Sequence, residues 1–270
     1  SMLHFSLSVM RLYRRPGFVR PDVIVGSSPH LFAAFGAVRL ASRLRVPFVF
    51  EVRDLWPESL VHLGRVSERH LAVLILGAVA SRLYRKAARV IVLLPRASEY
   101  LLGKGVPSEK LVWVPNGVDL KKIPFCGSLD ATGRFVLGYA GAHGTANGLD
   151  VLLDAAKLLG QDPQMQHVSI QLIGDGPQKA ILTQRAEAEK IANVSFHDPV
   201  PKDCIYDRLI SMDAFIFILE DVPLWQYGLS ANKLFDYLAM AKPTIFCAQV
   251  PENPVAAARA GIEVPNPTPQ

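Results

Sequence analysis

Short apolar runs alternate with longer amphipathic stretches along almost the whole chain, and this alternation constrains the fold most strongly. Most runs are rich in Val, Ile, Leu and Phe, which is typical of strands covered on both faces of a parallel sheet. The pattern therefore predicts an α/β protein. The expected strands are 22–27, 48–52, 90–94, 111–114, 135–140, 168–173, 194–197, 214–218 and 243–247. The expected helices are 31–44, 68–88, a short one from Glu99, 149–159, 177–192, 201–211 and 231–241.

The apolar rhythm lapses over residues 116–133, where Lys121, Lys122, Pro124, Gly127 and Gly133 occur. We interpret this stretch as a linker between two βαβ series. The sequence thus predicts two doubly wound parallel-sheet domains, 1–124 and 125–270, that face a cleft. Ligands of such folds bind at the carboxyl ends of strands, so the loops after the strands are the places to search.

Composition excludes several classes of protein. With 50% hydrophobic and 20% charged residues, disorder is not expected. The longest apolar run, 71–80, is shorter than the roughly 18 residues of a membrane-spanning helix, and no signal peptide is expected. Three cysteines without a CxxC pair argue against a disulfide framework or a zinc site. They favour a reducing compartment, and we expect a cytoplasmic protein.

Charge is unevenly distributed along the chain. Residues 1–90 carry 14 basic and 5 acidic residues, a net +9, whereas the remainder carries −4, which gives the total of +5. A basic first half suits an anionic surface or acceptor, and the segment 3–15 is a candidate amphipathic helix. A solvated basic face is the alternative explanation. Nucleic acid is not expected as a partner, because no aromatic and basic platform accompanies the arginines.

A glycine-rich loop, 141–148, follows the first strand of the second domain. Gly141 and Gly144 would let backbone N–H groups approach an anion near a helix N-terminus. His143 is a candidate phosphate contact. Because such turns are common in α/β proteins, an ordinary tight turn and a loop histidine remain the alternative.

The segment 227–237 carries a more specific signal. Ser230 is a plausible N-cap, and Asn232, Lys233 and Asp236 share one face of the helix that follows. Amide groups and an ammonium suit a diphosphate, and a carboxylate one turn deeper suits two ribose hydroxyls. The sequence therefore predicts a nucleoside diphosphate site, with a capped surface helix as the alternative.

In the first domain, Arg53 and Asp54 come directly after an expected strand, where charged groups usually face a cleft, and they are the candidate catalytic residues. The alternative is a pair that only holds the loop. No DxD, GxSxG or GxxxxGK[ST] motif occurs, and no set of side chains has metal-ligand spacing. A metal site is therefore not expected.

Taken together, six segments resemble glycosyltransferase family 4, whose members are retaining enzymes of the GT-B fold. The similarity is to bacterial surface-polysaccharide transferases, such as the N-acetylfucosamine transferases of O-antigen synthesis. The segments occur in family order over nearly the whole chain: 51–59, 114–119, 138–141, 148–156, 172–177 and 228–239.

The resemblance implies roles for individual residues. Asp236 matches the second, ribose-binding acid of the family's E-x7-E motif, and Gly228 replaces the first acid. The diphosphate-binding Arg and Lys of the family align near Ala142 and Asn147. The loop amides, Asn232 and Lys233 would then take more of the phosphate role. Arg53 takes the place of a cleft histidine beside the donor sugar, and the loop from Asp198 to Val200 would receive the base.

The resemblance also implies an activity. A hexosyl or N-acetylhexosaminyl group would pass from a UDP-sugar to a lipid-linked or saccharide acceptor, without metal or further cofactor. We expect a polyprenyl-diphosphate-linked acceptor at the inner face of the bacterial plasma membrane, where the basic first half would meet anionic lipid. A UDP-sugar 2-epimerase of the same fold and a non-catalytic nucleotide-sugar-binding protein are the alternatives.

The sequence also departs from the family pattern at both ends. Nothing before Asp22 supplies the family's opening strand and glycine-rich loop, and no final helix precedes Gln270. We therefore expect an incomplete first domain, weak binding of UDP, and little or no turnover by this chain.

Overall fold

The computed structural model describes residues 2–28, 30–64, 66–124 and 133–265, with side chains from residue 4 onward. The chain forms two compact units. The first comprises residues 1–115 and 222–230, and the second comprises 116–221 and 231–270. The expected domain boundary at 124/125 lies beside residues 125–132, which are outside the described residues, as is Cys126. Cys204 and Cys247 are free thiols.

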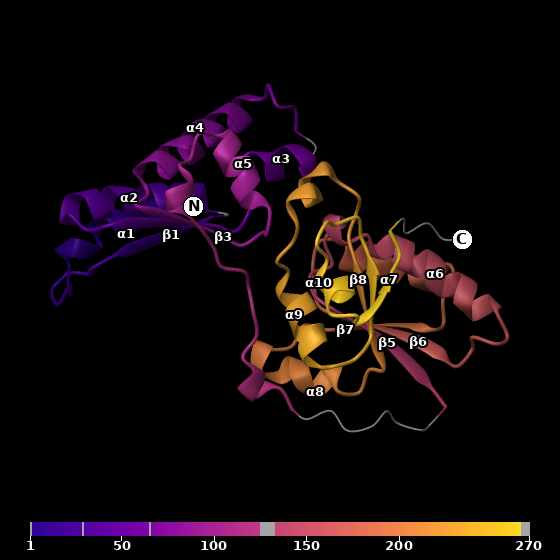
Figure 1. Cartoon of the computed structure of the whole chain (residues 1–270). Helices are drawn as coiled ribbons and strands as arrows, with labels where there is room; N and C mark the ends of the chain where they lie inside the picture. The colour runs from indigo at the N-terminus through magenta and orange to yellow at the C-terminus, as the bar shows by residue number, and fades with distance from the viewer. Residues whose placement is uncertain (1, 29, 65, 125–132, 266–270) are drawn as a thin grey trace. The chain divides into compact units, whose positions relative to one another are not determined.

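The first unit contains a four-stranded parallel sheet in the order β1-β2-β3-β4. Its strands are β1 (Ile24–Ser27), β2 (Phe48–Val52), β3 (Arg89–Val92) and β4 (Leu111–Trp113). Its helices are α1 (Met2–Arg11), α2 (Leu31–Leu44), α3 (Glu58–His62), α4 (Leu71–Lys86) and α5 (Ala97–Gly103). Because chain order equals sheet order, right-handed crossovers place α2, α4 and α5 on the same face of the sheet (Figure 1).

The core of the first unit lies between that face and the helices. Phe48, Phe50 and Val52 of β2 are buried there against α2 and α4. Helix α1 packs on α2, and the Ser6 hydroxyl donates to the Phe32 carbonyl at 2.7 Å. Gly36 permits this close approach, since a Cβ at that position would lie 2.6 Å from the Ser6 hydroxyl oxygen.

A short segment of chain, 222–230, leaves the second unit and packs into the first. Leu224 joins the core of the first unit, and the Tyr227 ring lies 5.4 Å from the Tyr100 ring. Gly228 has φ of +85° and lies so close to Pro95 that a side chain there would collide with it. The segment is therefore anchored on the first unit immediately before the chain returns to the second.

The second unit contains a six-stranded parallel sheet in the order β10-β9-β8-β5-β6-β7. Its strands are β5 (Phe135–Ala140), β6 (Val168–Ile173), β7 (Val194–His197), β8 (Ala214–Ile218), β9 (Thr244–Cys247) and β10 (Gly261–Glu263). Its helices are α6 (Leu149–Gln161), α7 (Lys179–Ala188), α8 (Ile205–Leu209), α9 (Asn232–Ala239) and α10 (Pro254–Ala257). The strand order reverses between β5 and β8, which marks the edge of the sheet where ligands of such folds bind.

The prediction of two parallel-sheet α/β domains is confirmed, and the expected strands lie in place. Several helices were predicted too long: the helix expected over 68–88 begins at Leu71, and the one expected over 177–192 spans Lys179–Ala188. The short elements α3, α10 and β10 were not predicted. In the part of the chain that the structure describes, no helix is both long and apolar enough to cross a membrane.

Candidate functional site

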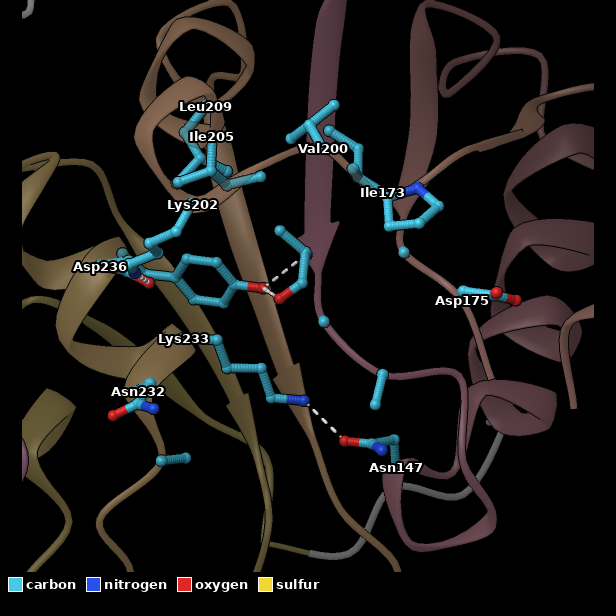
Figure 2. Close-up of a pocket in the computed structure, with 17 residues that line it drawn as sticks. Asn147, Ile173, Asp175, Val200, Lys202, Ile205, Leu209, Asn232, Lys233 and Asp236 are labelled. Atoms are coloured by element: carbon cyan, nitrogen blue, oxygen red, sulfur yellow. Dashed lines mark hydrogen bonds and ion pairs between the residues drawn. The ribbon is translucent and has the colours of Figure 1, made fainter. Parts of the chain in front are cut away.

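A cavity of about 610 Å³ opens in the second unit, at the carboxyl ends of β5 and β6 and beside the start of α9 (Figure 2). Its polar and charged lining comes from Asn147, Asp175, Lys202, Asn232, Lys233 and Asp236, and Tyr237 lies at its floor. Its apolar lining includes Ile173, Pro199, Val200, Ile205 and Leu209. The cavity thus combines one apolar wall with a few converging charged groups, as small-molecule sites commonly do.

Lys233 extends from the first turn of α9 into this cavity. Its Nζ donates to Asn147 Oδ1 at 2.6 Å (Figure 2). It also donates to the Tyr139 hydroxyl at 2.9 Å. The Nζ atom also lies 4.4 Å from the centre of the Tyr139 ring. Among the ion pairs of the described residues, none involves Lys233.

Burial of this ammonium lowers the pKa of Lys233 from 10.5 to about 7. A desolvated cation with neutral partners is stabilised by an anion that enters the cavity, because the anion supplies the missing counter-charge. The Lys233 side chain therefore makes this end of the cavity an anion-binding position.

Asp236 lies one turn deeper on α9, and its residue is only 7% exposed. The Tyr206 hydroxyl donates to its Oδ1 at 2.8 Å, and the Lys202 ammonium forms an ion pair with its Oδ2. The prediction placed Asp236 on an open polar face of the helix. In the structure the carboxylate is largely buried, and both of its oxygens have a partner.

The helix α9 is joined to the end of β5 by Tyr237, which lies in the second half of the helix. Its hydroxyl accepts from the Ala140 N–H at 2.7 Å and donates to the Ala140 carbonyl at 3.1 Å. The Tyr237 ring stacks on Phe215 at 4.5 Å. This contact helps to hold α9, and with it Lys233 and Asp236, beside the cavity at the end of β5, although β5 and α9 are far apart in the sequence.

The helix α9 differs from the prediction at both ends. Ser230 was predicted as the N-cap, but the cap position is Ala231, which makes no capping hydrogen bond through its side chain. The helix ends at Ala239, and two residues later Ala241 adopts a left-handed conformation with φ of +53°. Ser230 directly precedes the cap residue in the sequence, but it belongs to the segment packed on the first unit and does not line the cavity.

The glycine-rich loop uses several of its amides within the protein. The Gly141 N–H donates to the Ile173 carbonyl at 2.9 Å, and the His143 N–H donates to the Asp175 carbonyl at 2.8 Å. Gly141 lines the cavity, but Gly144 does not. The loop is therefore held against the end of β6, and less of it is available to a phosphate than the glycine pattern suggested.

His143 is fully buried beneath the loop and does not line the cavity. Its ring lies 6.0 Å from that of Tyr139 and 6.2 Å from that of Phe196, and both ring nitrogens lack a hydrogen-bond partner. Burial, with a further contribution from the positive charge of Lys179, lowers its pKa, which favours a neutral imidazole. The structure thus does not support a direct phosphate contact by His143.

The loop expected to receive the base reaches the cavity in part. Val200 and Pro199 line it, whereas the Asp198 side chain is exposed to solvent and pairs with Lys179 at 2.8 Å. Ile205 and Leu209 of α8 continue this apolar wall (Figure 2). An apolar surface of this kind suits the face of a flat ring.

Arg53 and Asp54 belong to the first unit, at the carboxyl end of β2. The buried Ser28 hydroxyl accepts from the N–H groups of Arg53 at 3.0 Å and of Asp54 at 3.2 Å. Desolvation raises the pKa of Asp54, and the positive charge of Arg53 opposes this shift. The loop is thus held by Ser28, and the catalytic role expected for both side chains stays a prediction.

Three residues of the site were not found by sequence reasoning: Tyr139, Lys202 and Tyr206. Tyr139 lies inside an apolar strand, and nothing in that pattern indicated that its hydroxyl would contact Lys233. Lys202 and Tyr206 lie on a segment expected to be an ordinary helix. Among the described residues, no group of three or more His, Cys, Asp or Glu side chains is placed to hold a metal ion.

Comparison with known proteins identifies both halves of the chain. Residues 6–117 match the glycosyl transferase 4-like domain, and residues 134–270 match glycosyl transferases group 1. The probable glycosyltransferase WbjE of Pseudomonas aeruginosa is 25% identical over 238 residues, which cover 84% of this chain and 57% of that protein. The chain thus spans a little over half the length of this relative.

Solved structures show the same architecture. Alr3699/HepE of Anabaena, in complex with UDP and glucose, matches with a TM-score of 0.68 at 17% identity, over 100% of this chain and 68% of that one. Sucrose-phosphate synthase of Thermosynechococcus elongatus matches with a TM-score of 0.70 at 14% identity, over 97% and 64% respectively. With two parallel-sheet units, a matching domain in each half and these structural neighbours, the chain belongs to the family 4 (group 1) glycosyltransferases and has the GT-B fold.

Proposed function

We propose that the second unit binds the nucleoside diphosphate of a UDP-sugar, and that the protein transfers the sugar to an acceptor. The observation that carries the proposal is the desolvated ammonium of Lys233, which pairs with no carboxylate among the described residues and lies in the same cavity as the buried Asp236. The UDP, UDP-glucose and glucose found with HepE support the choice of donor.

Each part of the donor has a matching part of the cavity. The diphosphate would lie beside Lys233 and the first turn of α9, where the helix dipole adds positive potential. The ribose hydroxyls would donate to Asp236 after taking the place of Lys202, whose side chain is 61% exposed. The base would pack on the wall formed by Val200 and Ile205.

The remaining features of the reaction are proposals that rest on the family. We expect retention of configuration, no metal or further cofactor, and transfer of a hexosyl or N-acetylhexosaminyl group. A lipid-linked saccharide at the inner membrane face is the proposed acceptor, within surface-polysaccharide synthesis. The basic first half of the chain supports this choice, as does similarity to WaaG, a glycosyltransferase involved in lipopolysaccharide biosynthesis.

Calorimetric titration of UDP, GDP, ADP and TDP tests the donor site. UDP should bind best, and Asp236→Ala should weaken UDP binding by about ten- to a hundredfold, because a hydrogen bond to a charged group contributes about 1.5–3 kcal/mol. Asp207→Ala, an exposed carboxylate on α8 outside the cavity, is the matched control and should bind UDP normally.

Tighter binding of another nucleotide, or equal UDP affinities for the two aspartate variants, would refute this assignment. Turnover is tested separately with UDP-sugar in the presence and absence of the lipid acceptor. Release of UDP that depends on the acceptor supports transfer, whereas isomerisation of the sugar without acceptor would identify an epimerase instead.

A further inference from the structure

A second cavity, of about 460 Å³, lies in the first unit between α2 and the N-terminal helical segment formed by α1 and the 3₁₀ turn Leu12–Arg14. It is lined by Met10, Arg11, Tyr13, Arg14, Arg39, Leu40 and Arg43. We name it the arginine pocket. It lies within a single unit, and none of its residues belongs to the donor site.

The four guanidinium groups of the arginine pocket have no acidic partner among the residues that the structure describes. Arg11, Arg14, Arg39 and Arg43 are all exposed, and none takes part in an ion pair within the described part of the chain. Like charges around one cavity repel one another, so a bound anion would stabilise this arrangement.

Aromatic rings help to hold the guanidinium groups in place. The Arg43 guanidinium lies 4.7 Å from the centre of the Tyr13 ring, and Arg14 Nε donates to the Tyr13 hydroxyl at 2.9 Å. The Arg39 guanidinium lies 4.6 Å from the Phe35 ring centre. These contacts orient the planar donor forks, which match the geometry of phosphate oxygens and can bind them in pairs.

Exposed apolar side chains accompany the arginine pocket on the same helical segment. Phe5, Leu7 and Leu12 are 55%, 47% and 37% exposed, respectively. A segment that presents arginines together with exposed apolar residues is typical of proteins that lie on an anionic lipid surface, because the arginines reach the headgroups while the apolar side chains enter the interface. A site for a small soluble phosphate would not need these apolar neighbours.

We propose that the arginine pocket binds the phosphate of an anionic phospholipid headgroup and docks the first unit on a membrane surface. This proposal extends the membrane location proposed above. It relies on that location only for the choice of a lipid headgroup, rather than a free phosphate, as the ligand. It does not depend on the donor site, which lies in the other unit.

Co-sedimentation with vesicles tests the proposal. The full chain should bind vesicles of phosphatidylcholine containing about one third phosphatidylglycerol and should not bind pure phosphatidylcholine. The double variant Arg39→Gln/Arg43→Gln should bind about thirtyfold more weakly, since one arginine near an anionic surface contributes about fivefold. The matched control, Arg82→Gln/Arg85→Gln on α4, removes the same charge outside the pocket and should lose less than about threefold.

A second variant separates the pocket from charge alone. Arg39→Lys/Arg43→Lys keeps the charge but loses the planar forks, and it should bind vesicles several-fold more weakly than the wild type. Circular dichroism and thermal unfolding should confirm that each variant is folded. UDP titration of the same variants should be unchanged, which distinguishes failure of this proposal from failure of the donor site.

Three results would overturn the proposal. Equal losses for the glutamine variants of the pocket and of α4 would indicate general electrostatic attraction, and full binding by the lysine variant would exclude a role for guanidinium geometry. Calorimetric binding of inorganic phosphate or glycerol 3-phosphate without any binding to vesicles would identify a soluble ligand instead.

Discussion

Replacing Lys233 by methionine should stabilise the fold and weaken the donor site at the same time. The shift of the Lys233 pKa from 10.5 to about 7 corresponds, at about 1.4 kcal/mol per pH unit, to a cost of about 5 kcal/mol for keeping the charged group in place. Methionine removes this cost but leaves Asn147 without its partner, which costs about 1–3 kcal/mol. We expect a net gain of about 2–4 kcal/mol in the free energy of unfolding at pH 6.

The effect should depend on pH in a defined direction. Lys233 has a depressed pKa in the folded protein, so between about pH 7 and 10.5 the unfolded chain binds the extra proton. The stability of the wild type should therefore rise with pH across this window, by about 3–4 kcal/mol from pH 7 to 10. Lys233→Met should lack this rise, so the difference between the two curves should shrink as the pH increases.

Denaturant unfolding from pH 6 to 10 measures the stability difference, and calorimetry with UDP measures the functional cost. Loss of a charge-assisted hydrogen bond to phosphate should weaken UDP binding by about ten- to a hundredfold. Lys121→Met, an exposed lysine of the same unit outside the cavity, should change neither quantity. A Lys233→Met protein that is less stable at pH 6 and binds UDP like the wild type would refute the reasoning.

Three further predictions follow from single contacts. Lys202→Met should bind UDP up to about fivefold more tightly by calorimetry, because the ribose no longer has to displace a lysine that is itself largely exposed and whose ion pair contributes about 0–1 kcal/mol; weaker binding would contradict this. Gly174→Ala should lose about 3 kcal/mol or more of stability in denaturant unfolding and lose UDP binding, since its φ is +149° and a Cβ would collide with the Gly141 carbonyl; a normal unfolding curve would contradict this. Gly228→Ala should release the segment 222–230 from the first unit, as a Cβ there would collide with Pro95; limited proteolysis should show new cleavage in that segment, and unchanged cleavage would count against the proposed anchoring.

Local signals explain why much of the fold could be predicted. The helix expected over 31–44 agrees with α2 at both ends, because His30 accepts from the Ala33 N–H at the start and Arg45 adopts a left-handed conformation at the end. The elements α10 and β10 were missed because they are short and lie in a proline-containing stretch. The helix α9 was predicted too long mainly at its C-terminus, since nothing local showed that Ala241 adopts a left-handed conformation with φ of +53°.

For the candidate site, the sequence predicted the residue types but not their partners. Lys233 and Asp236 were expected to lie side by side on an accessible face. The structure instead buries Asp236 and joins it to Lys202 and Tyr206, 34 and 30 positions away in the chain. It also desolvates Lys233 against Tyr139, 94 positions away. Such contacts depend on how strands and helices pack, which residue spacing within one helix does not encode.

The sequence by itself determined the parallel α/β architecture, its division into two βαβ series and the strand ends at which a ligand would bind. These follow from the period and length of apolar runs, which each segment carries locally. Only the tertiary structure decided that Lys233 has a lowered pKa and that Asp236 pairs with Lys202. It also decided that four arginines from α1, the following 3₁₀ turn and α2 share one pocket. Each of these depends on solvent exclusion and charge distribution between distant segments, and packing alone establishes both.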